Sequence, residues 1–371
     1  MLPKRIVFHV PSLRGGGAER VWVLMANELA ARGHHVTLLV WNAEGPNAAL
    51  RSDAVHLVDF GMTIHGESFG KPATLRGLWR MARFLRRHQP DAVYSAPEFA
   101  NLVMALSLIL SRSRAQFFPS FHAAAAIRSD TIGARVAVLL SGLVAHRATK
   151  AIAVSAGVGR DLEARGVRRT KVAVINNPLP PALTTPKRSY PFEAQLEAMG
   201  EGPVIITAGR LVPVKDHKTL LASVAKLIQH RPARLVIFGE GPLEAELRAF
   251  AVQLGIANHV LFAGYINDPA ACYAVADLFV LTSLTEGFGN VLVEAMAAGV
   301  PVVSTDCPHG PSEILEGGIY GALVAVGDAE GLALAMDKML SEPTSANSLK
   351  ARAADFEVGR IGDRYEALLA N

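Results

Sequence analysis

Two glutamates eight positions apart, Glu286 and Glu294, flank a glycine-bracketed turn and carry the strongest chemical signal in the chain. Residues 276–283 predict a short buried strand before the turn, and residues 290–298 predict a helix after it. Free N–H groups and the helix dipole make such a helix start an anion site. A carboxylate at this place is suited instead to accept hydrogen bonds from the hydroxyls of a sugar. For a glutamate pair in isolation, the alternative is a helix charge and a solvated helix face.

Two cations and a histidine follow other expected strands. Arg210 and Lys215 come after residues 204–208, and doubly wound folds bind ligands beyond the carboxyl ends of their strands. The planar fork of arginine and the mobile charge of lysine together suit a diphosphate, although either cation alone is more often a solubilising surface residue. His122 follows the expected strand over residues 116–121, where the alternative is a packed or exposed bystander.

Three glycines and a glutamate follow the first expected strand, residues 6–10. They are Gly15, Gly16, Gly17 and Glu19. Glycine lets the backbone come close to a ligand at the mouth of a helix. A dinucleotide site is disfavoured because the G-x-G-x-x-G spacing is missing and the second expected strand, residues 35–41, ends without a carboxylate for the ribose. A simple tight turn is the remaining alternative.

The spacing of Glu286 and Glu294 resembles the E-x7-E signature of retaining nucleotide-sugar glycosyltransferases with the GT-B fold, family 4 in particular. Similar motifs keep their order from Phe8 to Leu369. The resemblance implies an α/β protein with two doubly wound, Rossmann-like parallel-sheet domains that face a cleft. It places the acceptor on the first domain and the nucleotide-sugar on the second.

The resemblance also implies roles for single residues. His122 and Glu286 are the implied catalytic residues, which orient the sugar and do not act as nucleophiles. Arg210 and Lys215 are expected to contact the nucleotide diphosphate, and Glu294 the ribose. The further donor-side positions are Gly16, Gly17, Gly239, Ile266, Gly287, Phe288, Gly289 and Asn290, and the acceptor-side positions are Gly15 and Glu19.

The sequence departs from the family pattern at two of these places. Asp216 follows Lys215, where the family more often has glycine. Four alanines, residues 123–126, follow His122, where the usual neighbour is polar. The first departure is tolerable, and the second weakens the local match around His122.

The implied reaction is the transfer, with retention, of a hexose or N-acetylhexosamine from a UDP-sugar to a glycan or polyprenyl-diphosphate-linked acceptor in surface polysaccharide synthesis. GDP-mannose is the second choice of donor. No metal ion and no other cofactor is expected, because the site has no Asp-x-Asp motif. An epimerase or a phosphorylase of the same fold would need extra carboxylates and histidines or a cofactor lysine, for which we find no clear counterpart. A non-catalytic nucleotide-sugar-binding partner is the alternative from another class.

The length of 371 residues exceeds one ordinary core and predicts two domains. We expect them over residues 1–177 and 178–356, joined by a proline-rich linker at 178–186, with a C-terminal helix at about 357–371 that packs back on the first domain. Alternating strands and helices predict two doubly wound parallel sheets. The expected strands are 6–10, 35–41, 55–59, 92–95, 116–121, 151–155, 204–208, 234–238, 260–262, 278–282 and 302–305, and the clearest helices are 19–32, 75–89, 218–229, 243–254 and 290–298.

Charge is distributed unevenly along the chain. Residues 1–176 carry 23 Lys and Arg against 11 Asp and Glu, whereas the remainder carries 14 against 22. The basic half predicts an anionic partner. We find no nucleic-acid-binding signature, so a diphosphate-linked acceptor or an anionic membrane surface is the better interpretation. Residues 75–89 predict a basic amphipathic helix that could lie on such a membrane. Its four arginines on one face are Arg76, Arg80, Arg83 and Arg87. An ordinary surface helix is an equal alternative.

Two further features bear on the compartment. The two cysteines, Cys272 and Cys307, give neither a disulfide framework nor a metal cluster, which fits a reducing cytosol. The N-terminus runs directly into the first strand, and the longest apolar stretches are shorter than the ~20 residues of a transmembrane helix. We therefore expect a cytoplasmic protein, with peripheral contact to the inner face of the plasma membrane as a further hypothesis.

Overall fold

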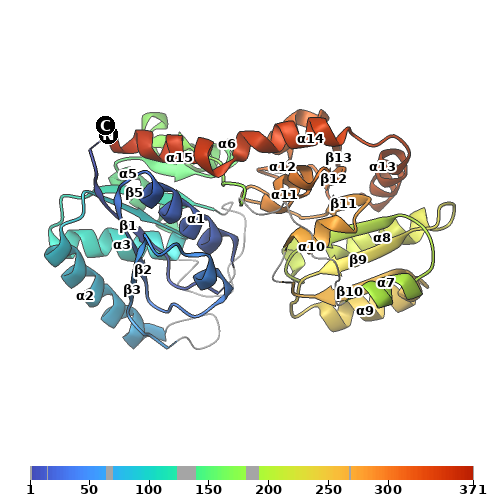
Figure 1. Cartoon of the computed structure of the whole chain (residues 1–371), viewed down its shortest axis with the longest axis horizontal. Helices are drawn as coiled ribbons and strands as arrows, with labels where there is room; N and C mark the ends of the chain where they lie inside the picture. The colour runs from blue at the N-terminus through green and yellow to red at the C-terminus, as the bar shows by residue number, and fades with distance from the viewer. Residues whose placement is uncertain are drawn as a thin grey trace. The chain divides into compact units, whose positions relative to one another are not determined.

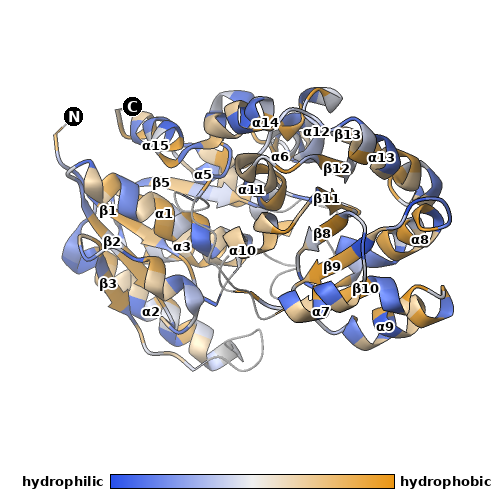
Figure 2. Ribbon diagram, turned by 45° about the vertical axis from the view of Figure 1, so that its right-hand side comes forward, coloured by the Kyte–Doolittle hydropathy of each residue, from blue (hydrophilic) through white to orange (hydrophobic). Residues whose placement is uncertain are grey.

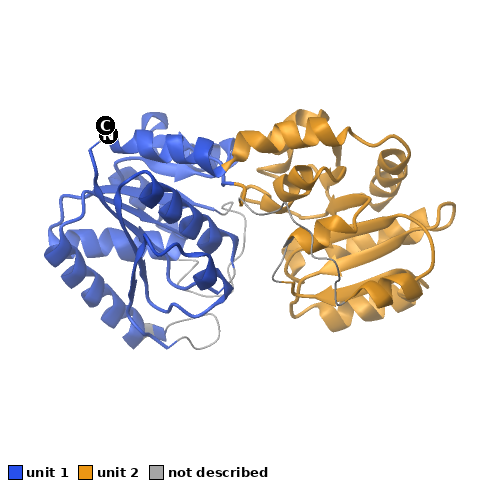
Figure 3. Cartoon of the chain, viewed as in Figure 1, with its two compact units in different colours: residues 1–178, 358–371 blue, residues 179–357 orange. Residues whose placement is uncertain are grey.

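The computed structural model of the chain describes residues 2–14, 16–63, 70–122, 139–180, 192–266 and 269–370. It divides into two compact units, one formed by Met1–Pro178 with Val358–Asn371 and the other by Leu179–Glu357 (Figure 3). Each unit is a parallel β-sheet with helices packed on it (Figure 1). Most of the expected linker at 178–186 lies outside the described residues.

The sheet of unit 1 has seven parallel strands in the order β3-β2-β1-β4-β5-β6-β7. The strands are β1 (Arg5–His9), β2 (His35–Val40), β3 (His56–Asp59), β4 (Ala92–Ser95), β5 (Gln116–Phe121), β6 (Ala151–Ala153) and β7 (Val172–Val174). The described helices are α1 (Gly17–Ala31), α2 (Gly70–His88), α3 (Glu98–Ser111), α5 (Ser141–Arg147), α6 (Ala156–Ala164) and the returning α15 (Val358–Ala367).

The sheet of unit 2 has six parallel strands in the order β10-β9-β8-β11-β12-β13. The strands are β8 (Val204–Ala208), β9 (Arg234–Phe238), β10 (Val260–Gly264), β11 (Leu278–Leu281), β12 (Val302–Thr305) and β13 (Ala322–Val324). The helices are α7 (Glu193–Ala198), α8 (His217–Leu227), α9 (Glu244–Gln253), α10 (Pro269–Ala274), α11 (Asn290–Ala298), α12 (Pro311–Ile314), α13 (Ala329–Ser341) and α14 (Ala346–Ala353).

Helices cover both faces of each sheet, so the side chains of the strands are buried on both faces. The strands are therefore short apolar runs. β4, β11 and β12 are buried along their whole length, and the strands of both units are largely hydrophobic (Figure 2). In unit 1, the ring of Phe8 stacks on that of Tyr94 at 4.8 Å and meets Trp22 edge-on at 5.5 Å. These contacts join β1, β4 and α1 into one core.

In both sheets the chain changes direction at the middle of the strand order. The change falls between β1 and β4 in unit 1 and between β8 and β11 in unit 2. At such a point, the loops after the two neighbouring strands diverge to opposite faces of the sheet. Open α/β sheets bind ligands in the crevice that this leaves at the carboxyl edge. The topology therefore singles out the loops after β1 and β4 in unit 1 and those after β8 and β11 in unit 2.

Two doubly wound parallel sheets confirm the fold class expected from the sequence. The bounds of β4, β5, β8, β9, β12 and α11 agree with the predicted ranges. The edge strands β7 and β13, of three residues each, were not predicted from the sequence. No helix in the described ranges is both long and apolar enough to cross a bilayer.

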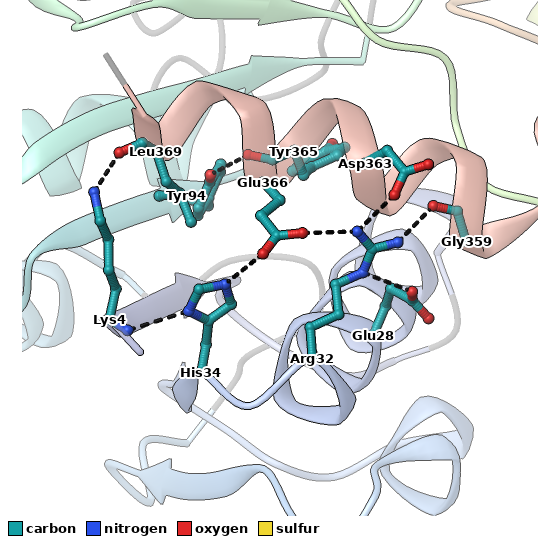
Figure 4. Close-up of polar contacts among 10 residues, drawn as sticks. All are labelled: Lys4, Glu28, Arg32, His34, Tyr94, Gly359, Asp363, Tyr365, Glu366 and Leu369. Atoms are coloured by element: carbon teal, nitrogen blue, oxygen red, sulfur yellow. Dashed lines mark hydrogen bonds and ion pairs between the residues drawn. The ribbon is translucent and has the colours of Figure 1, made fainter. Parts of the chain in front are cut away.

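The last helix, α15, is fixed to α1 by a charged cluster around Arg32 (Figure 4). The Arg32 guanidinium lies 2.7 Å from Oδ1 of Asp363 and 2.8 Å from Oε2 of Glu366. It also pairs with Glu28 at 2.9 Å and donates to the carbonyl of Gly359 at 2.7 Å. Burial opposes the charge of Arg32, but its bonds to the three carboxylates outweigh burial and raise its pKa. The hydrogen bond from Arg32 in turn lowers the pKa of Glu366.

A second row of contacts continues the attachment toward the C-terminus. The backbone N–H of Lys4 donates to Nδ1 of His34 at 3.1 Å, so Nε2 of His34 carries the hydrogen that Glu366 accepts at 3.3 Å. The hydroxyl of Tyr94 donates to the carbonyl of Tyr365 at 2.9 Å. Helix α15 is therefore an integral part of unit 1.

Candidate active site

The loops after β8 and β11 bring two predicted donor-site residues together in unit 2. Lys215 lies in a 3₁₀ turn, Pro213–Lys215, after β8, and Glu286 lies in the loop after β11. Nζ of Lys215 is 2.5 Å from Oε1 of Glu286, although 71 positions separate them in the chain. Because β8 and β11 pair in parallel, both loops leave the same edge of the sheet.

The Lys215–Glu286 pair is largely shielded and is held by a third residue. The side chains of Lys215 and Glu286 are 23% and 12% exposed. The hydroxyl of Ser283 donates to the same carboxylate oxygen, Oε1, at 2.6 Å. The Glu286 carboxylate is thus oriented by one cation and one hydroxyl. Ser283 was not among the predicted site residues, and its place at the end of an apolar strand was the signal available.

Backbone and side-chain bonds tie the two loops to each other. The Thr282 hydroxyl donates to the carbonyl of Lys215 at 2.9 Å, and the N–H of Leu284 donates to the carbonyl of Val214 at 2.8 Å.

The presence of Asp216, where the family more often has glycine, has a structural reason. Asp216 adopts a left-handed conformation, with φ of 45°, and its carboxylate accepts hydrogen bonds from Thr219 at the start of α8. Glycine would supply the conformation, whereas aspartate also caps the helix.

Arg210 lies in the exposed loop directly after β8, five residues before Lys215. Its carbonyl group meets Nε2 of His217 at 3.3 Å, and His217 is buried. Burial lowers the pKa of His217, which leaves it neutral at pH 7, when Nε2 can donate to that carbonyl. His217 was not predicted; it supports the backbone from which the Arg210 side chain projects.

Glycines shape the neighbouring loops. Gly239 has φ of 129°, and a Cβ atom there would lie 2.0 Å from the carbonyl oxygen of Gly209, so no side chain fits. The N–H of Gly239 donates to the carbonyl of Gly264 at 2.8 Å, two residues before Ile266. The loops after β8, β9 and β10 therefore lie in close contact, with Gly239 at their meeting point.

The turn between the two glutamates is buried up to the start of α11. Gly287, Phe288 and Gly289 are buried, and the ring of Phe288 packs edge-on against Phe356 at 5.4 Å. Gly289 has φ of 104° and precedes Asn290, the first residue of α11. The turn thus presents the backbone of a helix start at the same sheet edge as the Lys215–Glu286 pair.

Glu294 lies within α11 and is only 7% exposed. The hydroxyl of Tyr273, from α10, donates to Oε2 of Glu294 at 3.0 Å. Tyr273 is also buried and was not predicted from the sequence. A buried carboxylate needs hydrogen-bond donors in place of the water that burial removes, and Tyr273 supplies one.

A buried cysteine lies near Glu286. Burial and the negative charge of Glu286 raise the pKa of Cys307 to about 12, so its thiol is protonated at pH 7. The sulfur is therefore not a nucleophile in this state. In the described residues, no three His, Cys, Asp or Glu side chains are grouped to hold a metal ion.

The predicted residues of unit 1 gather around the start of α1 and the end of β5. Gly16 precedes the first helical residue, Gly17, and Glu19 lies in the first turn of α1. His122 follows β5, with Nε2 3.1 Å from the hydroxyl of Ser120. Gly15 and residues 123–126 lie outside the described residues.

His122 is a neutral base in this environment. Burial lowers its pKa to about 4, and its ring meets the ring of Trp22 edge-on at 5.8 Å. Trp22 belongs to α1, so this contact joins the glycine turn to the end of β5.

His9, at the end of β1, is a second histidine of unit 1 and was not predicted. It is fully buried, and its Nδ1 donates to the carbonyl of Leu39 at 2.9 Å. Burial lowers the pKa of His9 to about 4.

Comparison with known proteins identifies the family of the chain. A model for glycosyl transferases group 1 matches residues 191–356, and a model for glycosyltransferase family 4 matches residues 15–183. The lipopolysaccharide core biosynthesis glycosyltransferase LpsE of Rhizobium meliloti is 29% identical over 98% of this chain and 99% of its own length.

Two further similarities are informative. An N-acetylgalactosamine-N,N'-diacetylbacillosaminyl-diphospho-undecaprenol 4-alpha-N-acetylgalactosaminyltransferase from Campylobacter jejuni is 34% identical over 42% of this chain and 44% of its own length. The crystal structure of HepE from Anabaena with UDP-glucose superposes with a TM-score of 0.80 at 24% identity, over 99% of this chain and 100% of that one. At that identity the likeness shows the shared GT-B fold. With the two family models covering most of the sequence between them, the chain belongs to glycosyltransferase family 4, as its E-x7-E motif predicts.

Proposed function

We propose that the protein is a retaining glycosyltransferase that moves a hexose or N-acetylhexosamine from a UDP-sugar to a lipid-linked or growing glycan acceptor in surface polysaccharide synthesis. The observation that carries the proposal is the Lys215–Glu286 pair at the switch point of unit 2, oriented by Ser283 and close in sequence to the start of α11. It combines a cation for phosphate with a carboxylate for sugar hydroxyls. HepE, which shares the fold, binds UDP-glucose, and this supports a UDP-sugar donor.

The charges assign a task to each group. Arg210 and Lys215 bind the diphosphate and stabilise the negative charge that grows on it as it leaves. The ammonium of Lys215 is paired with Glu286, so a diphosphate would compete with this carboxylate for the cation. Glu286 then accepts hydrogen bonds from the sugar hydroxyls, and Glu294 from those of the ribose. A neutral His122 orients the sugar.

The proposed reaction is a same-face displacement. The acceptor hydroxyl oxygen bonds to the anomeric carbon on the face from which the diphosphate leaves, while the bond from that carbon to the phosphate oxygen breaks. The hydroxyl proton passes to the leaving phosphate. No metal ion is required in this scheme, because Arg210 and Lys215 supply the positive charge.

The acceptor class is inferred from relatives. LpsE is named for lipopolysaccharide core biosynthesis, and the Campylobacter enzyme acts on a diphospho-undecaprenol-linked sugar. Both support an acceptor on a lipid carrier. A GDP-mannose donor is the second candidate, and a nucleotide-sugar-binding partner without activity is the third.

Binding and turnover test these candidates separately. Thermal stabilisation is measured with UDP-, GDP-, ADP- and TDP-sugars without metal and again with EDTA. We expect UDP-sugars alone to stabilise the protein, K215M to weaken UDP at least about tenfold, and E286Q to keep UDP binding but lose transfer. Retention is read from the anomeric configuration of the product. Full transfer activity in E286A would overturn the site, and GDP-sugar binding would move the proposal to mannose.

A further inference from the structure

The exposed side of α2 combines positive charge with large apolar side chains. Helix α2 carries five arginines and no acidic residue over its 19 positions. Leu75 is 69% exposed and Trp79 is 62% exposed, although a helix that packs on its own sheet normally buries such residues. Met81 and Leu85 on the opposite side are fully buried. The helix therefore presents a second apolar stripe outward, flanked by arginines.

A shallow hollow of about 410 Å³ lies beside this stripe, between α2 and the end of β3. Three arginines and a histidine from successive turns of α2 line it: Arg80, Arg83, Arg87 and His88. The aromatic rings of Phe60 and Phe84 form apolar walls. Asp59 is the one carboxylate among the lining residues, and its Oδ1 accepts a hydrogen bond from the N–H of Gly61 at 2.8 Å.

The arginines of the hollow are available to an anion. Arg80 is fixed by a bond from its guanidinium to the carbonyl of Phe60, and Arg83 lies 5.6 Å from the centre of the Trp79 ring. Within the described residues, neither Arg83 nor Arg87 forms a salt bridge with an acidic side chain. Arg80, Arg83 and Arg87 give the hollow a positive charge that suits a phosphate group.

Apolar exposure continues from α2 onto the neighbouring helices. α2 packs against α3, and α3 packs against α5. The guanidinium of Arg86 donates to the carbonyl of Leu110 at 3.1 Å, which places the end of α3 beside the last turn of α2. Five exposed apolar residues lie on α3, just before α5 and within α5: Leu106, Ile109, Leu110, Leu139 and Leu143.

We propose that the exposed side of α2, continued over α3 and α5, docks on an anionic phospholipid bilayer, with a lipid phosphate in the hollow and Leu75 and Trp79 inserted among the acyl chains. A protein partner would need either an apolar surface or acidic side chains opposite this helix. Arginines interleaved with exposed leucines and a tryptophan match both layers of a bilayer interface at once. The inference concerns only unit 1 and stands independently of the sugar donor.

Trp79 reports on this surface directly. The chain has three tryptophans, and Trp22 and Trp41 are 0% exposed, so changes in emission on binding arise from Trp79. Fluorescence is recorded with vesicles of phosphatidylglycerol and phosphatidylcholine, with phosphatidylcholine alone, and with soluble glycerol phosphate. We expect a blue shift, and quenching by brominated acyl chains, with the anionic vesicles alone.

Matched variants separate the surface from general charge. R83E/R87E should weaken binding to anionic vesicles at least about tenfold. R168E/R169E reverses the same charge at two exposed arginines beside β7, the opposite edge strand of the sheet, and should bind as the unchanged protein does. L75S should keep binding but reduce the blue shift. Unchanged Trp79 emission with anionic vesicles, binding of glycerol phosphate without vesicle binding, or equal losses in the two double variants would overturn the proposal.

R83E/R87E should bind UDP-sugars as the unchanged protein does. Failure of vesicle binding is therefore distinguishable from failure of the proposed donor site.

Discussion

The hydroxyl of Tyr273 donates a hydrogen bond of 3.0 Å to Oε2 of Glu294, from one helix of unit 2 to another. The bond joins α10 to the second turn of α11. Both side chains are buried, so little water competes for the carboxylate. Tyr273 is a positioning residue in this arrangement, because it acts on the donor through Glu294.

Removing this hydroxyl should affect donor binding more than turnover. We expect Y273F to raise KM for the donor by about tenfold, since a hydrogen bond to a charged group contributes about 1.5 kcal/mol, and to leave kcat within about twofold. Y320F is the control, because Tyr320 packs near Arg352, 5.8 Å from its guanidinium, and has no predicted role in the site. A lowered kcat with unchanged KM would show that Glu294 does not bind the donor.

Ser283 orients Glu286 and should matter for the chemical step. S283A removes the donor of the 2.6 Å bond to Oε1 and leaves Lys215 in place. We expect kcat to fall by about tenfold with UDP affinity unchanged, measured by initial rates and calorimetry. S223A is the matched control: Ser223 is also fully buried in unit 2 but bonds to the carbonyl of Leu220 within α8. Equal effects of the two variants would refute the positioning role.

Acid should destabilise unit 1 through two histidines that follow or end its strands, His9 and His122. Burial lowers the pKa of His9 and of His122 to about 4, below the ordinary value of 6.5. Between these values the unfolded chain binds protons that the folded state does not, so stability is highest above about pH 6.5 and falls toward pH 4. The loss for the fully buried His9 is on the order of 3 kcal/mol.

The pH dependence can be assigned by substitution. Urea unfolding at pH 7.5 and pH 5 should show a smaller difference for H9Q than for the unchanged protein. H56Q alters an exposed histidine on β3 and should leave the difference as it is. An unchanged difference in H9Q would show that His9 is protonated in the folded state.

The attachment of α15 depends on Arg32. R32M leaves Glu28, Asp363 and Glu366 without their shared cation, and we expect the free energy of unfolding of unit 1 to fall by about 2 to 4 kcal/mol. Amide exchange in α15 should accelerate at the same time. R5M is the control, because Arg5 and Asp91 form an exposed pair, 57% and 42% exposed, whose loss costs less than about 1 kcal/mol. Protection of α15 equal to that in the unchanged protein would show that its apolar contacts suffice.

Local sequence determined much of the secondary structure and the family of the chain. Most strands of the two sheets are short apolar runs that end at small or turn residues, and this pattern is readable without knowing the neighbouring strands. The Glu286 to Glu294 motif lies on consecutive residues, so its strand, turn and helix could be predicted together, and the observed α11 has the predicted bounds. The fold class and the family follow from these local signals.

Tertiary structure decided which of these residues meet. Lys215 and Glu286 are paired because β8 lies beside β11, a neighbourhood that no local pattern encodes. The same holds for Tyr273 and Glu294, and for Arg32 and Glu366, which are 334 positions apart. The exposure of Trp79 was also beyond the sequence, because helical periodicity gives the relative directions of side chains and not which direction faces the sheet. Periodicity is a property of a segment, whereas contact and burial are properties of the packed whole.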